Sequence, residues 1–246
     1  MARIPQRPEE VFEEFTQDYQ SVFGDDLISI ILYGSGARGE YVPKKSDLNF
    51  LIVLAEKAMD RLKACFPLIR KWRKRRVTIP LFLTEAYIAS SLDTFPIEFL
   101  NFRENHKLVF GKDILAELSF NKKDIRLQCE RELKGKLLLL REAYLDSEGR
   151  TKELGQVSSA SLTAFLSQFR ALLYLRDTKI PEHNEELVSA TAKEIGFDES
   201  PFIEVLKVRQ GKGKLQRDAM EGMIERYLKA VQELWKQVDQ LEIKEA

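Results

Sequence analysis

The chain has 246 residues, 44% of them hydrophobic and 32% charged, which is the composition of an ordinary globular protein and excludes an intrinsically disordered one. Lysine plus arginine and aspartate plus glutamate number 39 each, so the net charge does not favour nucleic acid or an anionic membrane as a partner. Without a transmembrane-length apolar run or a signal-peptide core, and with two cysteines that lack metal-ligand spacing, we expect a reduced cytoplasmic protein with no membrane contact.

The first predicted element is a helix from Pro8 to Gly24, which begins with proline and acidic residues and ends at glycine. Its apolar residues recur at helical spacing and should pack one face on a sheet. These residues are Val11, Phe12, Phe15, Tyr19, Val22 and Phe23.

Two apolar runs follow, Ile28 to Tyr33 and Leu48 to Leu54, with the length and β-branched content of buried strands. Between them, Gly34 allows the backbone to approach a ligand, and with Ser35 it opens a short turn whose N–H groups suit a phosphate. Asp47 precedes the second strand, where a carboxylate can hold Mg²⁺. The pattern therefore predicts a phosphate and metal site between the two strands.

The residues of this region form a spaced motif, which reads Tyr33-Gly34-Ser35, eleven intervening residues, then Asp47-Leu48-Asn49-Phe50. This motif resembles the signature of the nucleotidyltransferase superfamily, which includes DNA polymerase β and the aminoglycoside nucleotidyltransferases. Arg38-Gly39-Glu40 and Ser46 also fit its small bacterial members.

The resemblance implies Mg²⁺-dependent transfer of a nucleoside monophosphate from a nucleoside triphosphate, with ATP as the expected nucleotide, to an unknown acceptor hydroxyl. It assigns catalysis and metal binding to Asp47 and Asn49, and nucleotide binding to Gly34, Ser35, Arg38 and Ser46. Ser46 has the alternative role of capping its local turn.

The sequence departs from the family pattern at two acidic positions. The second carboxylate of the motif is Asn49, which faces the same pocket as Asp47 but contributes no charge, and this should weaken a divalent site by on the order of a few kcal/mol. The family's third acid should fall near Arg76 to Thr78, where no acid is present. Glu85 or Asp93 could replace it only after a register shift.

Ala55 to Arg75 reads as a second helix with a kink or break at Pro67. The run Arg70 to Arg76 holds six cations in seven residues, and it is either a solvated helix end or a patch that touches nucleotide phosphates or RNA. Val77 to Thr84 reads as a third strand, which Pro80 places at a sheet edge or a bulge. Two short helices, Glu85 to Leu92 and Pro96 to Phe102, and a strand at Lys107 to Phe110 complete this half.

From residue 119 the pattern is helical. Predicted helices span Asp124 to Leu145, Ser158 to Leu175, Asn184 to Ile195, Ser200 to Val208 and Gln216 to about Ile243. The basic, glycine-rich loop at residues 209–214 is no phosphate-binding P-loop, because no strand precedes it. The segment Ala171 to His183 resembles the C-terminal domain of kanamycin-nucleotidyltransferase-like proteins, which is related to the helical HEPN domains.

We therefore expect an α+β protein: a nucleotidyltransferase-like domain at 1–118, with a mixed sheet and flanking helices, then an all-α bundle at 119–246. Two functions remain open. One is an active nucleotidyltransferase. The other is a pseudoenzyme that binds nucleotide, or a protein partner, as a sensor, scaffold or regulatory subunit. In either case the helical bundle offers a surface for a homodimer or a protein partner.

Overall fold

The computed structural model describes residues 3–210 and 217–243. The chain divides into two compact units, Met1–Ser119 and Phe120–Ala246. Most of the predicted basic loop at 209–214 lies outside the described residues. Within the described ranges, no helix combines the length and the apolar character that a membrane crossing needs.

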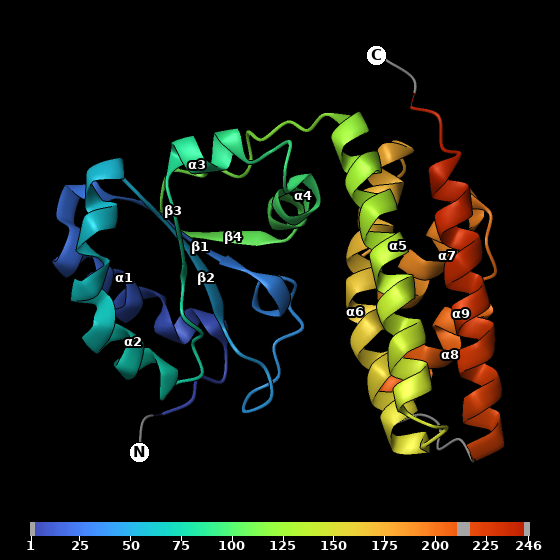
Figure 1. Ribbon diagram of the computed structural model, residues 1–246. Coiled ribbons are helices and arrows are strands. Elements are labelled where there is room, and N and C mark those ends of the chain that lie inside the picture. The colour runs from blue at the N-terminus through green and yellow to red at the C-terminus, as the bar shows by residue number, and fades with distance from the viewer. Residues whose placement is uncertain (1–2, 211–216, 244–246) are drawn as a thin grey trace. The chain divides into compact units, whose positions relative to one another are not determined.

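The first unit is built on a mixed four-stranded sheet in the order β3-β2-β1-β4 (Figure 1). β1 is antiparallel to β2 and to β4, whereas β2 and β3 are parallel. The strands are β1 (Leu27–Tyr33), β2 (Asn49–Leu54), β3 (Leu81–Leu83) and β4 (His106–Gly111). The predicted α+β class is confirmed.

The third strand is shorter than its apolar pattern predicted. Only Leu81–Leu83 pairs with β2, and Val77 forms an isolated parallel bridge to Leu48. Pro80 separates the two pairings because it has no N–H to donate to a ladder. β3 is an edge strand, as Pro80 predicted.

An aromatic core joins the first helix to the sheet. The helix α1 (Phe12–Phe23) is flanked by single 3₁₀ segments, and Gly24 ends it with a φ of 55°. The ring of Phe15 stacks on Phe50 of β2 with centroids 4.1 Å apart, and the buried Trp72 indole meets Phe15 edge-on at 5.0 Å. Figure 1 shows α1 and α2 together on one side of the sheet.

The segment after β2 differs from the single helix that was predicted. Residues Glu56–Cys65 form 3₁₀ turns, and the α-helix α2 begins only at Phe66 and ends at Arg73. Pro67 lies in the first turn of α2. Proline fits there, but in mid-helix its ring would clash with the carbonyl four residues earlier, so the α-helix starts beside it and does not run through it.

Two helices lie between β3 and β4 in the chain, α3 (Glu85–Ser90) and α4 (Pro96–Glu104). Phe102 of α4 packs on Tyr33 at the end of β1, with ring centroids 4.7 Å apart. α4 therefore covers the sheet near the end of β1, next to the predicted site.

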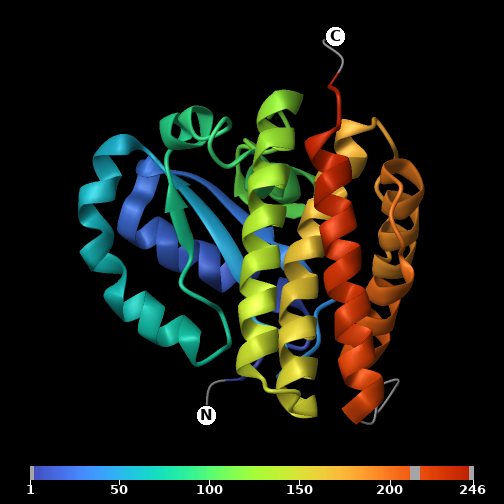
Figure 2. The ribbon, with the colours of Figure 1, turned by 45° about the vertical axis from the view of Figure 1, so that its right-hand side comes forward.

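The second unit is a bundle of five described helices. α5 packs against α6 and α9, and α6 also packs against α7 and α8 (Figures 1 and 2). α6 begins seven residues before the predicted start and buries Leu154 in the added turns. The bounds are α5 (Lys122–Asp146), α6 (Thr151–Leu175), α7 (Asn184–Ile195), α8 (Ser200–Arg209) and α9 (Arg217–Asp239).

Candidate functional site

The glycine-serine turn follows β1 directly. Gly34 has a φ of 74°, a left-handed conformation that favours glycine, and its carbonyl accepts hydrogen bonds from the N–H groups of Ala37 and Arg38, both at 3.1 Å. A Cβ at Gly36 would lie 3.2 Å from Leu48 Cδ2, so this turn is also pressed against the core. The two glycines therefore shape a tight turn at the end of the central strand.

Asp47 is held by an arginine from the segment after α2. Nη2 of Arg76 lies 2.9 Å from Oδ1 of Asp47, and the same guanidinium donates to the carbonyls of Lys45 (3.0 Å) and Ser46 (3.3 Å). Arg76 has a φ of 61°, which is uncommon for a residue with a side chain. The guanidinium thus spans the loop before β2 and neutralises Asp47.

Asn49 has its own partner on the neighbouring segment. The hydroxyl of Thr78 donates to Oδ1 of Asn49 at 3.0 Å. A Cβ at Gly34 would lie 3.4 Å from the amide nitrogen of Asn49. Asn49 therefore lies between the glycine turn and Thr78.

The strand register explains both pairs. Leu48 and Val77 form a parallel bridge and point into the core, where they are 0% and 2% exposed. Their neighbours point to the other face, so position 76 lies across from Asp47 and position 78 across from Asn49. The segment where the family's third acid was expected is thus beside the motif, but it presents arginine and threonine.

This donor set does not fit Mg²⁺. A hard cation needs charged oxygen ligands, and here one carboxylate faces one guanidinium while Asn49 and Thr78 are neutral. A unit charge pair at 4 Å is worth about 4 kcal/mol at an effective dielectric of 20, so attraction to Asp47 would be largely offset by repulsion from Arg76. Across the part of the chain that the structure describes, no three histidine, cysteine, aspartate or glutamate side chains gather to form a metal site.

The two substitute acids are placed elsewhere. Glu85 begins α3 beyond the far end of β3 and pairs with Lys112 at 3.2 Å. Asp93 lies in the turn between α3 and α4, where its carboxylate accepts from the hydroxyl of Thr94. Because β2 and β3 are parallel, Glu85 and Asp47 lie at opposite ends of the pair.

The remaining nucleotide-binding candidates lie on the loop between β1 and β2. Ser46 accepts a hydrogen bond from the Val42 N–H at 3.0 Å, which is the turn-capping geometry. Arg38 pairs with Glu40 at 3.0 Å and its side chain is 31% exposed. The carbonyl of Ser46 also accepts a hydrogen bond from Arg76.

Much of the basic run is engaged in ion pairs. Lys71 pairs with Asp18 (2.6 Å), and Arg75 pairs with Glu14 while its guanidinium lies 4.8 Å from the Trp72 ring centre. Arg76 is the member that reaches the pocket. The signal that could have identified it was its position directly before Val77, in register with the motif.

Tyr33 and His106 lie in register with Asn49 on neighbouring strands. In the sheet Tyr33 pairs with Asn49 on one side and with His106 on the other, so these side chains point to one face. Burial raises the pKa of Tyr33. His106 is held by Asp113, with 2.9 Å between Nε2 and Oδ1, and by the carbonyl of Arg103.

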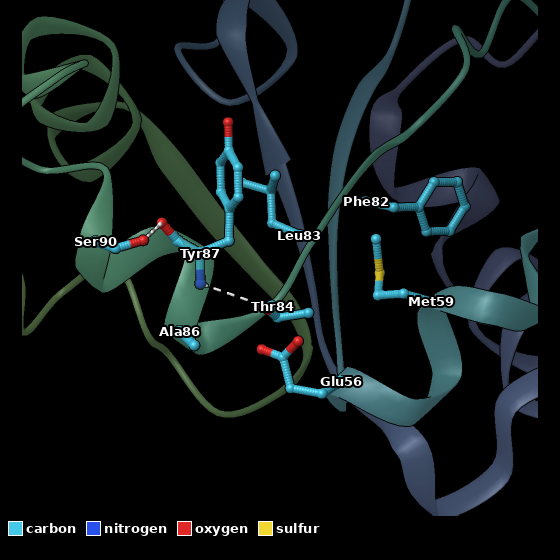
Figure 3. Close-up of a pocket in the computed structure, with 8 residues that line it drawn as sticks. All are labelled: Glu56, Met59, Phe82, Leu83, Thr84, Ala86, Tyr87 and Ser90. Atoms are coloured by element: carbon cyan, nitrogen blue, oxygen red, sulfur yellow. Dashed lines mark hydrogen bonds between the residues drawn. The ribbon is translucent and has the colours of Figure 1, made fainter.

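A separate pocket of about 660 Å³ lies at the other end of β2 and β3 (Figure 3). At about 3.3 Å per residue, the length of β2 puts it roughly 16 Å from Asn49. Figure 3 shows Phe82 and Met59 close together on one side and Tyr87 and Ser90 on the other, with Glu56 below Thr84. Its lining is Glu56, Met59, Phe82, Leu83, Thr84, Ala86, Tyr87 and Ser90.

The fold of this chain, with its mixed sheet and its glycine-serine turn before the Asp-x-Asn strand, is similar to that of a solved adenyltransferase. A solved structure of a spectinomycin adenyltransferase, AAD(9) from Enterococcus faecialis, matches with a TM-score of 0.53 over 91% of this chain and 99% of that one, at 14% identity. That identity supports the shared fold alone.

A curated relative gives a more local match. It is named "Putative protein adenylyltransferase MJ1305", from Methanocaldococcus jannaschii, and is 46% identical over 56 residues. The match spans 22% of this chain and 37% of the relative's own length. No family model matches the chain.

Proposed function

We propose that this chain is a nucleoside-triphosphate-binding protein with the nucleotidyltransferase fold, and that it does not perform metal-dependent nucleotidyl transfer. The observation that carries this proposal is the ion pair between Asp47 and Arg76, because it occupies the one carboxylate of the motif. In this proposal Gly34 and Ser35 receive the phosphates and Arg38 contacts them from the loop. The protein then acts as a nucleotide sensor or a regulatory subunit.

Two features support a nucleotide as the ligand. The turn at Gly34–Gly36 has glycine at both ends, which allows a phosphate to approach its backbone closely. The spectinomycin adenyltransferase with the same fold was solved with ATP and spectinomycin, so ATP is the nucleotide to test first.

The test measures binding and transfer in the same preparation. With MgCl₂ and ATP labelled at the α-phosphate, we expect saturable ATP binding by calorimetry and no more pyrophosphate release than from Asp47→Asn. Asp25→Asn, the same change at an exposed residue, is the matched control. Pyrophosphate release that Asp47→Asn abolishes and Asp25→Asn preserves would overturn the loss of transfer. Absence of any ATP binding would overturn the nucleotide role.

A second candidate is active AMP transfer to a protein hydroxyl, which the 46% identity to a protein named as an adenylyltransferase favours. The hydroxyl oxygen would bond to the α-phosphorus of ATP, the bond from that phosphorus to the bridging oxygen would break, and pyrophosphate would leave as the hydroxyl proton passes to solvent. Label from the α-phosphate on an acceptor protein, with an equal amount of pyrophosphate, would establish it.

A further inference from the structure

One cation is built into the predicted nucleotide pocket. The guanidinium of Arg76 is fixed by Asp47 and by the carbonyls of Lys45 and Ser46, so its position does not depend on a flexible side chain finding its ligand. Among the described residues, Arg76 has three partners, which contact Nε or Nη2, and Nη1 donates to none. The side chain is 35% exposed. Two N–H groups of a fixed arginine are therefore available to a ligand.

A series of neighbouring residues links the glycine turn to Arg76. Gly34 is next to the amide of Asn49, Asn49 is two residues from Asp47 on the same strand face, and Asp47 contacts Arg76. A phosphate chain that begins at the glycine turn can thus extend toward Nη1 of Arg76.

The charge of this surface favours an anion. Asp47 and Arg76 cancel, as do Arg38 and Glu40, which form an ion pair. Lys44 and Lys45 are exposed on the loop that Arg76 holds, and neither pairs with a carboxylate among the described residues. The local sum is positive, although the formal charge of the whole chain is zero.

The backbone conformation of Arg76 is energetically unfavourable for a residue with a side chain. Arg76 adopts a φ of 61°, and its carbonyl accepts from the Leu48 N–H at 2.9 Å. A non-glycine residue keeps a left-handed conformation where the surrounding structure fixes it, and such positions concentrate at ligand sites.

We propose that Arg76 takes the place of the divalent cation in this pocket, so that the triphosphate of a nucleotide binds to the protein without Mg²⁺. This inference rests on the proposed nucleotide-binding function and specifies how its ligand is recognised. The planar guanidinium supplies N–H donors to phosphate oxygens, and the exposed Lys44 and Lys45 supply the net positive charge. Asp47 is then the counter-ion of Arg76, whose guanidinium the carbonyls of Lys45 and Ser46 also hold in place, and it holds no metal.

The first experiment compares ATP binding in EDTA and in MgCl₂ by calorimetry at constant ionic strength. We expect the affinity in EDTA to equal or exceed that in Mg²⁺, since Mg²⁺ neutralises the phosphates that Arg76 attracts. Inorganic tripolyphosphate should compete with ATP in EDTA. Binding that requires Mg²⁺, or a failure of tripolyphosphate to compete, would overturn this inference and leave the nucleotide role intact. Absence of ATP binding in both conditions would overturn both.

Two substitutions separate a ligand role from a structural one. Arg76→Gln should weaken ATP binding in EDTA by about tenfold or more, while Arg70→Gln, at an exposed position in the same basic run, should not. Asp47→Asn releases Arg76 from its counter-ion and should tighten binding in EDTA, whereas a metal-dependent site would lose binding. Circular dichroism verifies that each variant is folded. Weaker binding by Asp47→Asn in EDTA, or equal losses for Arg76→Gln and Arg70→Gln, would contradict the proposal.

Discussion

Arg76 and Asp47 face each other across two neighbouring segments of the sheet, with 2.9 Å between Nη2 and Oδ1. The bridge between Leu48 and Val77 fixes this register, so the backbone places the two residues side by side. The relationship converts a motif that elsewhere concentrates negative charge into a neutral pair. Building a metal site at this position should therefore require changes on both segments.

The first prediction concerns Asn49→Asp combined with Arg76→Asp. The double variant places three carboxylates on one face, at positions 47, 49 and 76, where the native chain has one carboxylate and one guanidinium. We expect Mn²⁺ binding to appear or strengthen by at least tenfold in the double variant and to change little in Asn49→Asp alone. The Mn²⁺ affinity of each variant is measured from the electron paramagnetic resonance signal of free Mn²⁺.

A matched control keeps the total charge the same. Asn49→Asp with Arg70→Asp makes the same charge change but places it away from the pocket, on an exposed part of α2. Equal Mn²⁺ affinity in the two double variants would show that the gain is a general charge effect and that the register argument is wrong.

The sequence predicts the two central strands and the glycine turn well because each has a local cause. Buried strands need apolar runs, and the left-handed turn at Gly34 needs glycine. The absence of an acid from Arg76 to Thr78 was also visible in the sequence. What the sequence did not predict is that Arg76 turns back to Asp47, because six clustered cations are typical of a solvated helix end.

The contact between Arg76 and Asp47 depends on where α2 ends. α2 ends at Arg73, and the left-handed residue Arg76 directs the chain into the bridge at Val77. Helical periodicity cannot locate the end of α2, because no capping residue marks that end in the sequence. The 3₁₀ turns at Glu56–Cys65 were missed for a related reason, because the effect of Pro67 extends to the preceding turns.

Lys44 provides a prediction about backbone strain. It has a φ of 65°, is exposed and pairs with no described carboxylate. Glycine adopts this conformation without a Cβ penalty, so Lys44→Gly should be more stable than Lys44→Ala by about 1 kcal/mol. Urea denaturation of the two variants gives the difference. A less stable glycine variant would indicate that the loss of chain entropy outweighs the relief of strain.

Asp18 links α1 to α2 through one oxygen. Its Oδ2 accepts from Nε1 of the buried Trp72 at 2.9 Å and from Nζ of Lys71 at 2.6 Å. Asp18→Ala leaves the indole N–H without an acceptor, which should lower the free energy of unfolding by about 1–3 kcal/mol. Asp18→Asn retains an oxygen acceptor and should lose less. Tryptophan fluorescence during urea unfolding measures both, and equal losses would contradict the role of the indole hydrogen bond.

The last prediction concerns the thiol of Cys65, which is 2% exposed. Burial raises its pKa from 9.0 to about 11, because the thiolate is poorly solvated in the core. The raised pKa means that the folded state favours the neutral thiol. This contribution to stability is fully present below about pH 9 and is lost as the pH rises through about 11. In the native protein, labelling of Cys65 by a thiolate-specific reagent should keep rising beyond pH 9, whereas in urea it should level off near the ordinary pKa of 9.0. Mass spectrometry separates Cys65 from Cys129, which is also buried. A native labelling rate that levels off at pH 9 would mean that the reagent reaches Cys65 through local opening and that the folded environment does not control its ionisation.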